Sequence, residues 1–327
     1  MLMGRDDQPG EQNNSSPELE GAHQVEFQWS FLAPRYWPTW SFYLLCVFLR
    51  PIPIKVLNRL ADRFANLLVR GNGRRKQLAM ANLSLCFPEL SAAERLSLYH
   101  RHARILTHVY LNYAKLLFGN TRSLLERVDT AGEEIIQQLR DTGKNIILFL
   151  PHSLAFEYIG QWCVLHYPVV SVVRTHNENP LLDWIVTRFR TRFGAKFVSS
   201  TASMRPLIRS VRAGNFLFYL PDEDQGQANA VFAPFYGVAK ATMPTLARLA
   251  RACNAQVIPV VSLYDPDSGR FQLRFEPPMK DLTDTDPVEV AAQINQVIEH
   301  IIDVDRAQYM WSAKVFRTRP AGEKKLY

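Results

Sequence analysis

Six short apolar runs, most of them separated by segments of helical length, constrain the fold of this chain more than any other feature. Most of the runs are apolar at consecutive positions, which is typical of strands buried on both faces. Strands of that kind joined by helices form parallel sheets. We therefore predict an α/β fold with a mainly parallel central sheet flanked by helices. The runs are NIILFL (145–150), VVSVVR (169–174), AKFVSS (195–200), NFLFYL (215–220), AQVIPVVSLY (255–264) and FQLRFE (271–276).

The composition fits one large folded domain. With 47% hydrophobic residues, a chain of 327 residues can bury a full core. Cys46, Cys86, Cys163 and Cys253 are scattered without a CxxC pair, so a zinc ribbon and a disulfide framework are both unsupported, and a reducing compartment fits best. The net charge of +7 suits a partner rich in phosphate or carboxylate, such as nucleic acid, an anionic membrane or an acidic carrier protein.

The N-terminal part of the chain is predicted to lie outside the folded domain. Residues 1–30 begin with a polar, acidic stretch and are predicted to form a disordered tail. Residues 31–54 contain an unbroken apolar run from Trp40 to Leu49 and are predicted to form a single membrane-anchoring helix. The alternative is a buried hydrophobic helix of a soluble protein.

The stretch from residue 50 to residue 76 is strongly basic, with Asp62 as its one acid. Positive-inside bias then places the domain, residues 55–327, on the cytoplasmic side. An amphipathic helix is predicted within this stretch, and it either lies on anionic lipid or packs on the domain. Its apolar positions are Ile54, Leu57, Leu60, Phe64 and Leu67.

The stretch FLPHSLAFEY (149–158) places His152 and Glu157 just beyond a predicted strand. In open α/β sheets, chemistry gathers at the carboxyl ends of the strands. If Glu157 begins a helix after that turn, its carboxylate can bind one imidazole nitrogen and leave the other free to accept a proton. The alternative is a buried histidine and an unrelated surface carboxylate.

The stretch PHSLAFE (151–157) resembles the H-x4-D/E motif of the glycerolipid-type acyltransferases, and in particular the late acyltransferases of lipid A biosynthesis. The similarity covers nearly all of the chain after residue 30, in the family's order. FYGVAKATMPTLARL and SLYDPDSGRFQLRFEPPMKDL are most similar to the myristoyltransferase branch, and the lauroyltransferase branch is the runner-up. Further similar blocks are PRYWPTW (34–40), ANLSLCFP (81–88), NPLLDWIVTRFRTRFG (179–194), YLPDEDQG (219–226), VIPVVSLYD (257–265) and QYMWSAKVFRTRP (308–320).

The resemblance implies transfer of an acyl chain from acyl carrier protein to the hydroxyl of a 3-hydroxyacyl chain on a Kdo-bearing lipid A precursor, at the inner membrane. It implies His152 as the general base and Glu157 as the group that orients and charges it, with no cofactor. No G-x-S-x-G elbow frames a serine, so direct transfer is predicted in place of an acyl-enzyme on Ser153.

Two alternatives remain at this point. An enzyme of the same fold could acylate another membrane lipid, such as a glycerophosphate. A protein of a different class could bind membranes without catalysis and recruit nucleic acid through its basic helix. The intact pair of His152 and Glu157 argues against the second alternative, so the predicted partners are the carrier protein, the lipid A precursor and the anionic inner membrane, without nucleic acid.

Four further residues match family blocks and are predicted to bind substrate. Arg190 and Arg192 are expected to contact substrate phosphate or a developing oxyanion, because a guanidinium is always charged and can donate two hydrogen bonds. The alternative is a pair of solvated arginines on the flank of a helix. Lys240 and Thr242 are expected to line the same cleft.

Asp222 and Asp224 follow another predicted strand end and are predicted to position a sugar hydroxyl or to hold an arginine. Without a third ligand at suitable spacing, no metal site is predicted there. His100, His102 and His108 are not expected to bind a metal either, because residues two apart on a helix point to different faces.

Overall fold

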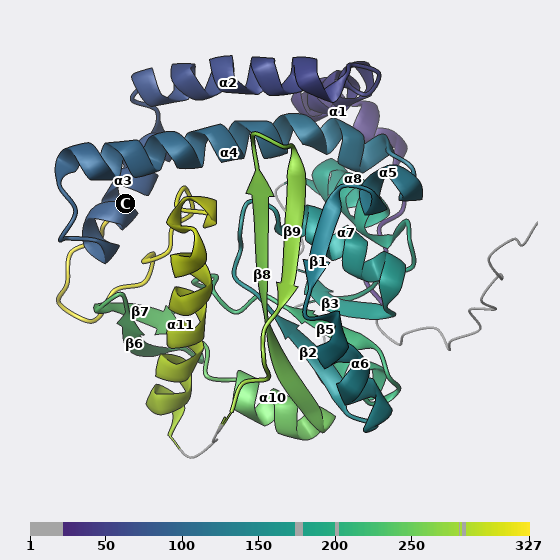
Figure 1. Ribbon diagram of the computed structural model, residues 1–327, viewed down its shortest axis with the longest axis vertical. Helices are drawn as coiled ribbons and strands as arrows, with labels where there is room; N and C mark the ends of the chain where they lie inside the picture. Colours follow the sequence, from purple (N-terminus) through teal and green to yellow (C-terminus); the bar gives the residue numbers. More distant parts are fainter. Residues whose placement is uncertain (1–21, 174–178, 200–202, 281, 283–285) are drawn as a thin grey trace, which may run out of the picture.

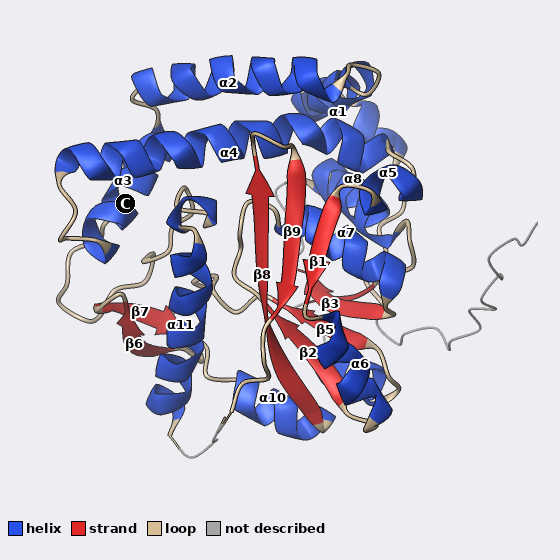
Figure 2. Ribbon diagram, viewed as in Figure 1, coloured by secondary structure: helices blue, strands red, loops and turns tan. Residues whose placement is uncertain are grey.

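The computed structural model describes residues 22–173, 179–199, 203–280, 282 and 286–327. Seven strands of the described chain form one central sheet in the order β1-β9-β8-β2-β5-β3-β4, with helices around it (Figure 2). The sheet strands are β1 (Val128–Ala131), β2 (Asn145–Phe149), β3 (Val169–Val173), β4 (Lys196–Ser199), β5 (Phe216–Tyr219), β8 (Ala255–Asp265) and β9 (Arg270–Phe275).

The predicted mainly parallel sheet is confirmed. Five of the six neighbouring strand pairs are parallel, and the pair of β8 and β9 is antiparallel. The six predicted strands correspond to β2, β3, β4, β5, β8 and β9. In β2, Ile146 and Leu148 pack on one face of the sheet while Ile147 and Phe149 pack on the other, as expected for a strand buried on both sides.

Three strands were not predicted. β1 is only four residues long and exposed at three of its positions, so its sequence carries no apolar signal. β6 (Val231–Phe235) and β7 (Val238–Thr242) form a separate antiparallel hairpin. Its two turn residues, Tyr236 and Gly237, both have positive φ, which is the backbone geometry that a two-residue hairpin turn requires.

Helices cover both faces of the sheet (Figure 1). One core cluster joins the sheet to α3, α9, α10 and α11, and the other joins it to α4, α6 and α7. The helices are α1 (Trp37–Leu49), α2 (Ile54–Arg70), α3 (Arg74–Cys86), α4 (Ala92–Phe118), α5 (Thr121–Leu125), α6 (Glu133–Asp141), α7 (Phe156–His166), α8 (Pro180–Thr191), α9 (Arg205–Arg212), α10 (Leu246–Cys253) and α11 (Pro287–Val304), with short 3-10 turns η1 (Trp29–Leu32), η2 (Pro34–Tyr36) and η3 (Arg306–Gln308).

The long helix α4 supports the N-terminal helices. It begins with a capping box, in which the Ser91 hydroxyl accepts from the Glu94 amide and the Glu94 carboxylate accepts from the Ser91 amide. Figure 1 shows α2 running along the outer side of α4, away from the sheet, with α1 near one end of α2. The predicted helix at residues 54–67 therefore exists, and it packs on the domain through Leu57, Ala61 and Ala65.

The N-terminal predictions have mixed outcomes. Residues 1–21 of the predicted tail lie outside the described residues, whereas residues 22–30 lie on the body, where the His23 amide donates to Phe197 O at 2.7 Å. Residues 31–54 form two 3-10 turns and the 13-residue α1 in place of one long helix. No helix in the described part of the chain combines the length and apolarity needed to cross a membrane, and the predicted anchor is not confirmed.

Candidate active site

His152 and Asp222 meet beyond the ends of two neighbouring strands. β2 and β5 run parallel, and Phe149 is paired with Tyr219 at the carboxyl end of both. His152 lies three residues past Phe149, and Asp222 lies three residues past Tyr219. Equal steps from a paired position bring the two side chains together at the edge where active sites of α/β sheets form.

Asp222 holds the histidine with both carboxylate oxygens. His152 Nδ1 lies 2.8 Å from Asp222 Oδ1, and the His152 amide donates to Asp222 Oδ2 at 3.0 Å. The Asp222 side chain is buried, whereas the His152 side chain keeps 29% of its surface exposed. A hydrogen on Nδ1 donated to Asp222 leaves Nε2 as the nitrogen able to accept a proton.

The same contact sets the charge preferences of the pair. Burial acts to lower the pKa of His152, but the Asp222 charge and hydrogen bond outweigh burial and raise that pKa above its usual value. Burial acts to raise the pKa of Asp222, and the opposite charge and hydrogen bonds of His152 overcome it, so the pKa is lowered. Asp222 therefore stays ionised and stabilises the imidazolium form of His152.

The C-terminal segment closes around the histidine turn. The Met310 amide donates to His152 O at 3.0 Å, and the Leu154 amide donates to Gln308 O at 2.7 Å. Tyr309 between them is buried, and its pKa is well above the usual value because of burial and then the nearby Asp222 carboxylate. These bonds fix the backbone that carries the imidazole.

Glu157 does not make the predicted contact with His152. It lies in the first turn of α7, and its carboxylate accepts from Arg190 Nε at 3.1 Å and from Arg190 Nη2. The contact with one imidazole nitrogen that we predicted for Glu157 is made instead by Asp222, at Nδ1. The physical reason is that Glu157 is carried onto α7 while the strand register delivers Asp222 directly to the imidazole.

The side chains of Arg190 and Arg192 bind different partners. Arg190, near the end of α8, reaches Glu157 and remains partly exposed. Arg192 Nη1 instead donates to Leu117 O at 2.6 Å, and its guanidinium lies over the Phe193 ring, 4.2 Å from the centroid. Of the two arginines predicted to bind substrate, only Arg190 contacts a residue of the PHSLAFE stretch in the described structure, namely Glu157.

Asp224 binds the C-terminal segment. Its carboxylate accepts from the Thr318 amide at 2.6 Å, from the Thr318 hydroxyl at 2.7 Å and from the Gly226 amide at 3.0 Å. Neither of the predicted roles, positioning a sugar or holding an arginine, matches these contacts. The two aspartates of PDEDQG thus have different partners: Asp222 binds His152, and Asp224 binds the C-terminal segment at Thr318.

Lys240 and Thr242, which were predicted to line a cleft, are both buried. Lys240 is fully buried, and its Nζ lies 3.5 Å from the Thr242 hydroxyl, which donates to Asn295 Oδ1 at 3.0 Å. Burial lowers the pKa of Lys240, and the charges of Asp222 and Asp224 oppose that shift. As both side chains are covered, the predicted substrate contact gives way to an internal role, in which Lys240 lies near the two aspartates.

Ser153 and the histidines of α4 are occupied elsewhere. The Ser153 hydroxyl is buried and hydrogen-bonds to the Ser262 hydroxyl, so it faces the core. His100 Nε2 lies 3.1 Å from Asn66 Oδ1, His102 Nδ1 lies 3.0 Å from Ala307 O, and His108 Nε2 lies 2.9 Å from an Asp62 oxygen. The three imidazoles thus face three different partners.

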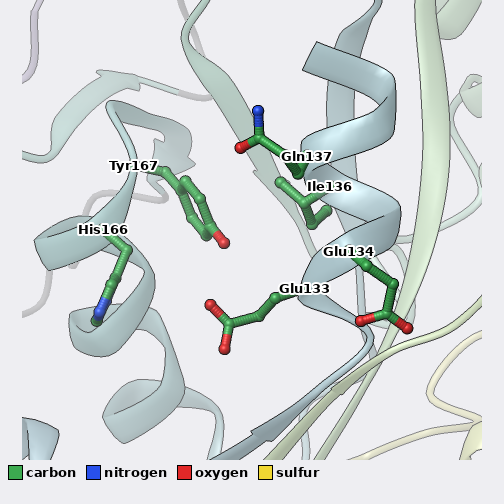
Figure 3. Close-up of a pocket in the computed structure, with 6 residues that line it drawn as sticks. All are labelled: Glu133, Glu134, Ile136, Gln137, His166 and Tyr167. Carbon is green, nitrogen blue, oxygen red and sulfur yellow. The ribbon is translucent and has the colours of Figure 1, made fainter. Parts of the chain in front are cut away.

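A cavity of about 340 Å³ lies at the opposite end of α7 from the histidine turn (Figure 3). The 11 residues of α7 rise about 16 Å, which separates the cavity from the site. In Figure 3 the Tyr167 ring and the Glu133 carboxylate face one another across this space. None of the predicted site residues lines it; the lining residues are Glu133, Glu134, Ile136, Gln137, His166 and Tyr167.

Comparison with known proteins identifies the family of the chain. The family model for bacterial lipid A biosynthesis acyltransferases matches residues 24–318. The chain belongs to this family. It is 32% identical over 306 residues to the lipid A biosynthesis myristoyltransferase of Escherichia coli (strain K12), covering 92% of this chain and 94% of the relative.

Other members of the family are similar at nearly the same level. A lipid A biosynthesis acyltransferase of Haemophilus influenzae is 32% identical over 304 residues, covering 92% of this chain and 94% of the relative. The lipid A biosynthesis lauroyltransferase of E. coli is 30% identical over 306 residues, covering 92% and 98%. The chain is therefore an acyltransferase of lipid A biosynthesis, and overall identity does not separate the myristoyl and lauroyl branches.

Proposed function

We propose that this acyltransferase moves a fatty acyl chain from acyl carrier protein to a 3-hydroxyacyl hydroxyl of a Kdo-bearing lipid A precursor. The observation that carries the proposal is the imidazole of His152, which Asp222 holds at Nδ1 while part of the ring remains exposed. An alcohol is a weak nucleophile, and a positioned base accelerates its attack by about 10² to 10⁴-fold.

In the proposed reaction, the acceptor hydroxyl attacks the thioester carbonyl carbon as His152 Nε2 removes its proton. The new ester bond forms to carbon, the carbon–sulfur bond breaks, and the proton passes from the imidazolium to the leaving sulfur. Asp222 keeps the correct tautomer and stabilises the imidazolium between the two proton transfers. Ser153 takes no part, since its hydroxyl is bonded to Ser262.

The pair of Glu157 and Arg190 has a separate role in this proposal. Glu157 holds the guanidinium by contacts at Nε and Nη2, and Arg190 remains partly exposed. A guanidinium held from one side can use its remaining N–H groups to bind phosphate or a developing oxyanion. Glu157 thus serves the reaction through Arg190, and Arg190 contacts the substrate.

The proposed setting is the cytoplasmic side of a bacterial inner membrane, where an amphipathic acceptor and an acidic carrier protein meet. The net charge of +7 favours both an anionic surface and an acidic carrier. Within the family, we assign the chain to the last, myristoyl-type secondary acylation. The FYGVAKATMPTLARL block supports that assignment, and the preceding lauroyl-type step is the competing one.

The test is acyl transfer by the full-length protein, with carrier-bound lauroyl and myristoyl chains as donors and product identification by mass. The acceptors are Kdo-bearing lipid A precursors with and without the first secondary chain, and lysophosphatidate. We expect myristate to be added to the precursor that already carries one secondary chain. Preferential use of lauroyl donor on the other precursor would move the chain to the lauroyl step, and acylation of lysophosphatidate alone would refute the lipid A acceptor.

A further inference from the structure

Lys240 on β7 is a fully buried lysine that the proposed reaction does not use. Lysine is almost never buried to this degree without a partner of opposite charge. Within the described part of the chain, its ammonium donates one hydrogen bond, to the Thr242 hydroxyl at 3.5 Å. An ammonium has three N–H donors, and its removal from water is costly unless other groups stabilise the charge. One long hydrogen bond to a neutral hydroxyl does not offset that cost.

The side chains around the ammonium in the hairpin and α11 are neutral ones. The Thr242 hydroxyl donates to Asn295 Oδ1 on α11 at 3.0 Å, and Asn295 Nδ2 donates to Pro234 O at 2.9 Å. The centroid of the Phe235 ring lies 5.8 Å from Lys240 Nζ. These contacts hold the hairpin against α11, but they supply no negative charge to the lysine.

Two buried carboxylates supply the negative charge. The charges of Asp222 and Asp224 both act on Lys240 and oppose the effect of its burial. Thr318 donates to Asp224 through its amide and its hydroxyl. The next residue, Arg319, donates from Nη1 to the carbonyl oxygen of the residue before Lys240, at 3.0 Å. The lysine is therefore shared by the carboxylate that holds the imidazole and the carboxylate that holds the C-terminal segment.

The charges of Asp222, Asp224 and Lys240 depend on one another. Burial acts to raise the pKa of Asp222, and the charge of Lys240 assists His152 in lowering it. When His152 is neutral, as a base must be, two negative charges and one positive charge are buried together. Without the ammonium, two negative charges would remain in a place shielded from water, where like charges favour the binding of a proton. The base would then be free only at higher pH.

Other titratable groups face the same cluster. Burial, and then the Asp222 carboxylate, place the pKa of Tyr309 well above its usual value, so this phenol stays neutral. After burial and the contacts with Asp222, Glu223 acts to raise the pKa of His152 and Arg190 acts to lower it. A change at the buried lysine leaves all of these groups in place, so its effect can be measured separately from theirs.

We propose that the buried ammonium of Lys240 is the counter-charge that keeps Asp222 and Asp224 ionised together, so that Lys240 acts on His152 through Asp222 as a positioning residue. The inference rests on the proposed role of His152 as the base. It adds the residue that allows this base to be free at neutral pH. Lys240 itself contacts no substrate in this proposal, because its side chain is fully buried.

The experiment compares the full-length wild type with Lys240→Met, Asp224→Asn, the combination of these two, and Thr242→Val. Methionine keeps an unbranched chain without the charge. Thr242→Val is the matched control, because it removes the hydrogen-bond partner of the lysine and changes no charge. One measurement is the pH–rate profile of single-turnover acyl transfer per folded molecule, with circular dichroism to verify the fold. The other is titration of the His152 imidazole by NMR without substrate.

We expect Lys240→Met to move the acidic limb of the pH–rate profile upward by about one pH unit and to raise the pKa of His152. The rate should fall by about tenfold on the acidic side and recover at higher pH. This direction is opposite to that expected for Asp222→Asn. In the combined variant, both measurements should return toward wild type, because a negative charge is removed with the positive one. Thr242→Val should leave both in place.

An unmoved acidic limb or an unmoved His152 titration in Lys240→Met would overturn the proposal, and so would the absence of any return in the combined variant. If Lys240→Met does not fold alone, the combined variant is compared with Asp224→Asn, and the same upward movement of the limb is required. The NMR titration needs no acyl transfer. A wild type that transfers no acyl chain would therefore refute the proposed function, while the titration would still test the role of Lys240.

Discussion

Two carboxylate-centred pairs, His152 with Asp222 and Glu157 with Arg190, differ in what brings them together. The first joins the ends of two strands whose register is fixed by backbone hydrogen bonds. The second joins two helices, α7 and α8, through long side chains. The histidine is thus oriented by a carboxylate from the neighbouring strand end, whereas Glu157, the acidic residue of the same sequence motif, binds Arg190.

The largest effect is expected when the base itself is removed. His152→Ala should lower kcat by about 10² to 10⁴-fold, because no other group replaces the proton acceptor. The measurement is single-turnover acyl transfer, with circular dichroism to verify the fold. Activity within a few-fold of wild type would show that the base lies elsewhere. The pair of His152 and Asp222 would then have no larger role in catalysis than the pair of Glu157 and Arg190.

The next largest effect should come from Asp222→Asn. The amide keeps the shape but removes the charge, so we expect roughly 100-fold loss of kcat. In the wild type, activity should rise with pH through the elevated pKa of His152, because the base must be unprotonated. Without Asp222, burial dominates and the pKa falls, so this acidic limb should move to lower pH. If the acidic limb of the pH–rate profile stays at the same pH in Asp222→Asn, Asp222 does not control the pKa of the His152 imidazole.

A smaller effect is expected from Glu157→Gln, at about tenfold, because the amide still holds Arg190 by one hydrogen bond. If Glu157 acts through Arg190, the double variant Glu157→Gln with Arg190→Gln should be no worse than Arg190→Gln alone. The loss should appear largely in KM if the guanidinium binds phosphate. Additive losses in a double-mutant cycle would instead mean that Glu157 acts on the substrate or on His152 independently.

The smallest effect on the chemical step is expected from Asp224→Ala. Losing three hydrogen bonds to a buried carboxylate should lower the free energy of unfolding by about 2 to 3 kcal/mol. The rate per folded molecule should remain within about threefold. Urea unfolding measures the first quantity, and Glu323→Ala, which breaks a partly exposed pair with Arg319, is the control, with an expected cost below about 1 kcal/mol. Unchanged stability would contradict the structural role of Asp224.

The sequence predicted the sheet well because most of its strands are apolar on both faces. It could not predict which strands are neighbours, since pairing depends on register across the whole chain. The partner of His152 was missed for that reason, although one signal was present. The quartets FLPH (149–152) and YLPD (219–222) share the pattern of an aromatic residue, leucine and proline. In each quartet the polar residue, His152 or Asp222, follows the end of a predicted strand by the same number of residues.

For α2 we predicted an apolar stripe that faces either lipid or the domain, and the structure divides that stripe between an inner and an outer side of the helix. The apolar stripe expected on α2 does not all face the protein: Leu57 is buried, but Phe64 and Leu67 are exposed while Ala61 and Ala65 make the contact with α4. Hydrophobic spacing locates a helix and cannot tell which of two apolar sides meets the body. The predicted cleft position of Lys240 also differs from the structure, in which this lysine is fully buried. Lysine is rarely fully buried, so the sequence alone does not indicate such a position.

The measurement that tests the account most directly is the titration of the His152 imidazole by NMR in wild type, Asp222→Asn and Glu157→Gln. His152→Gln identifies the resonance among the eight histidines. We predict that the pKa of His152 in the wild type lies above its usual value, falls clearly in Asp222→Asn, and changes much less in Glu157→Gln. A large fall in Glu157→Gln with little change in Asp222→Asn would contradict the assignment of Asp222 as the residue that orients the base.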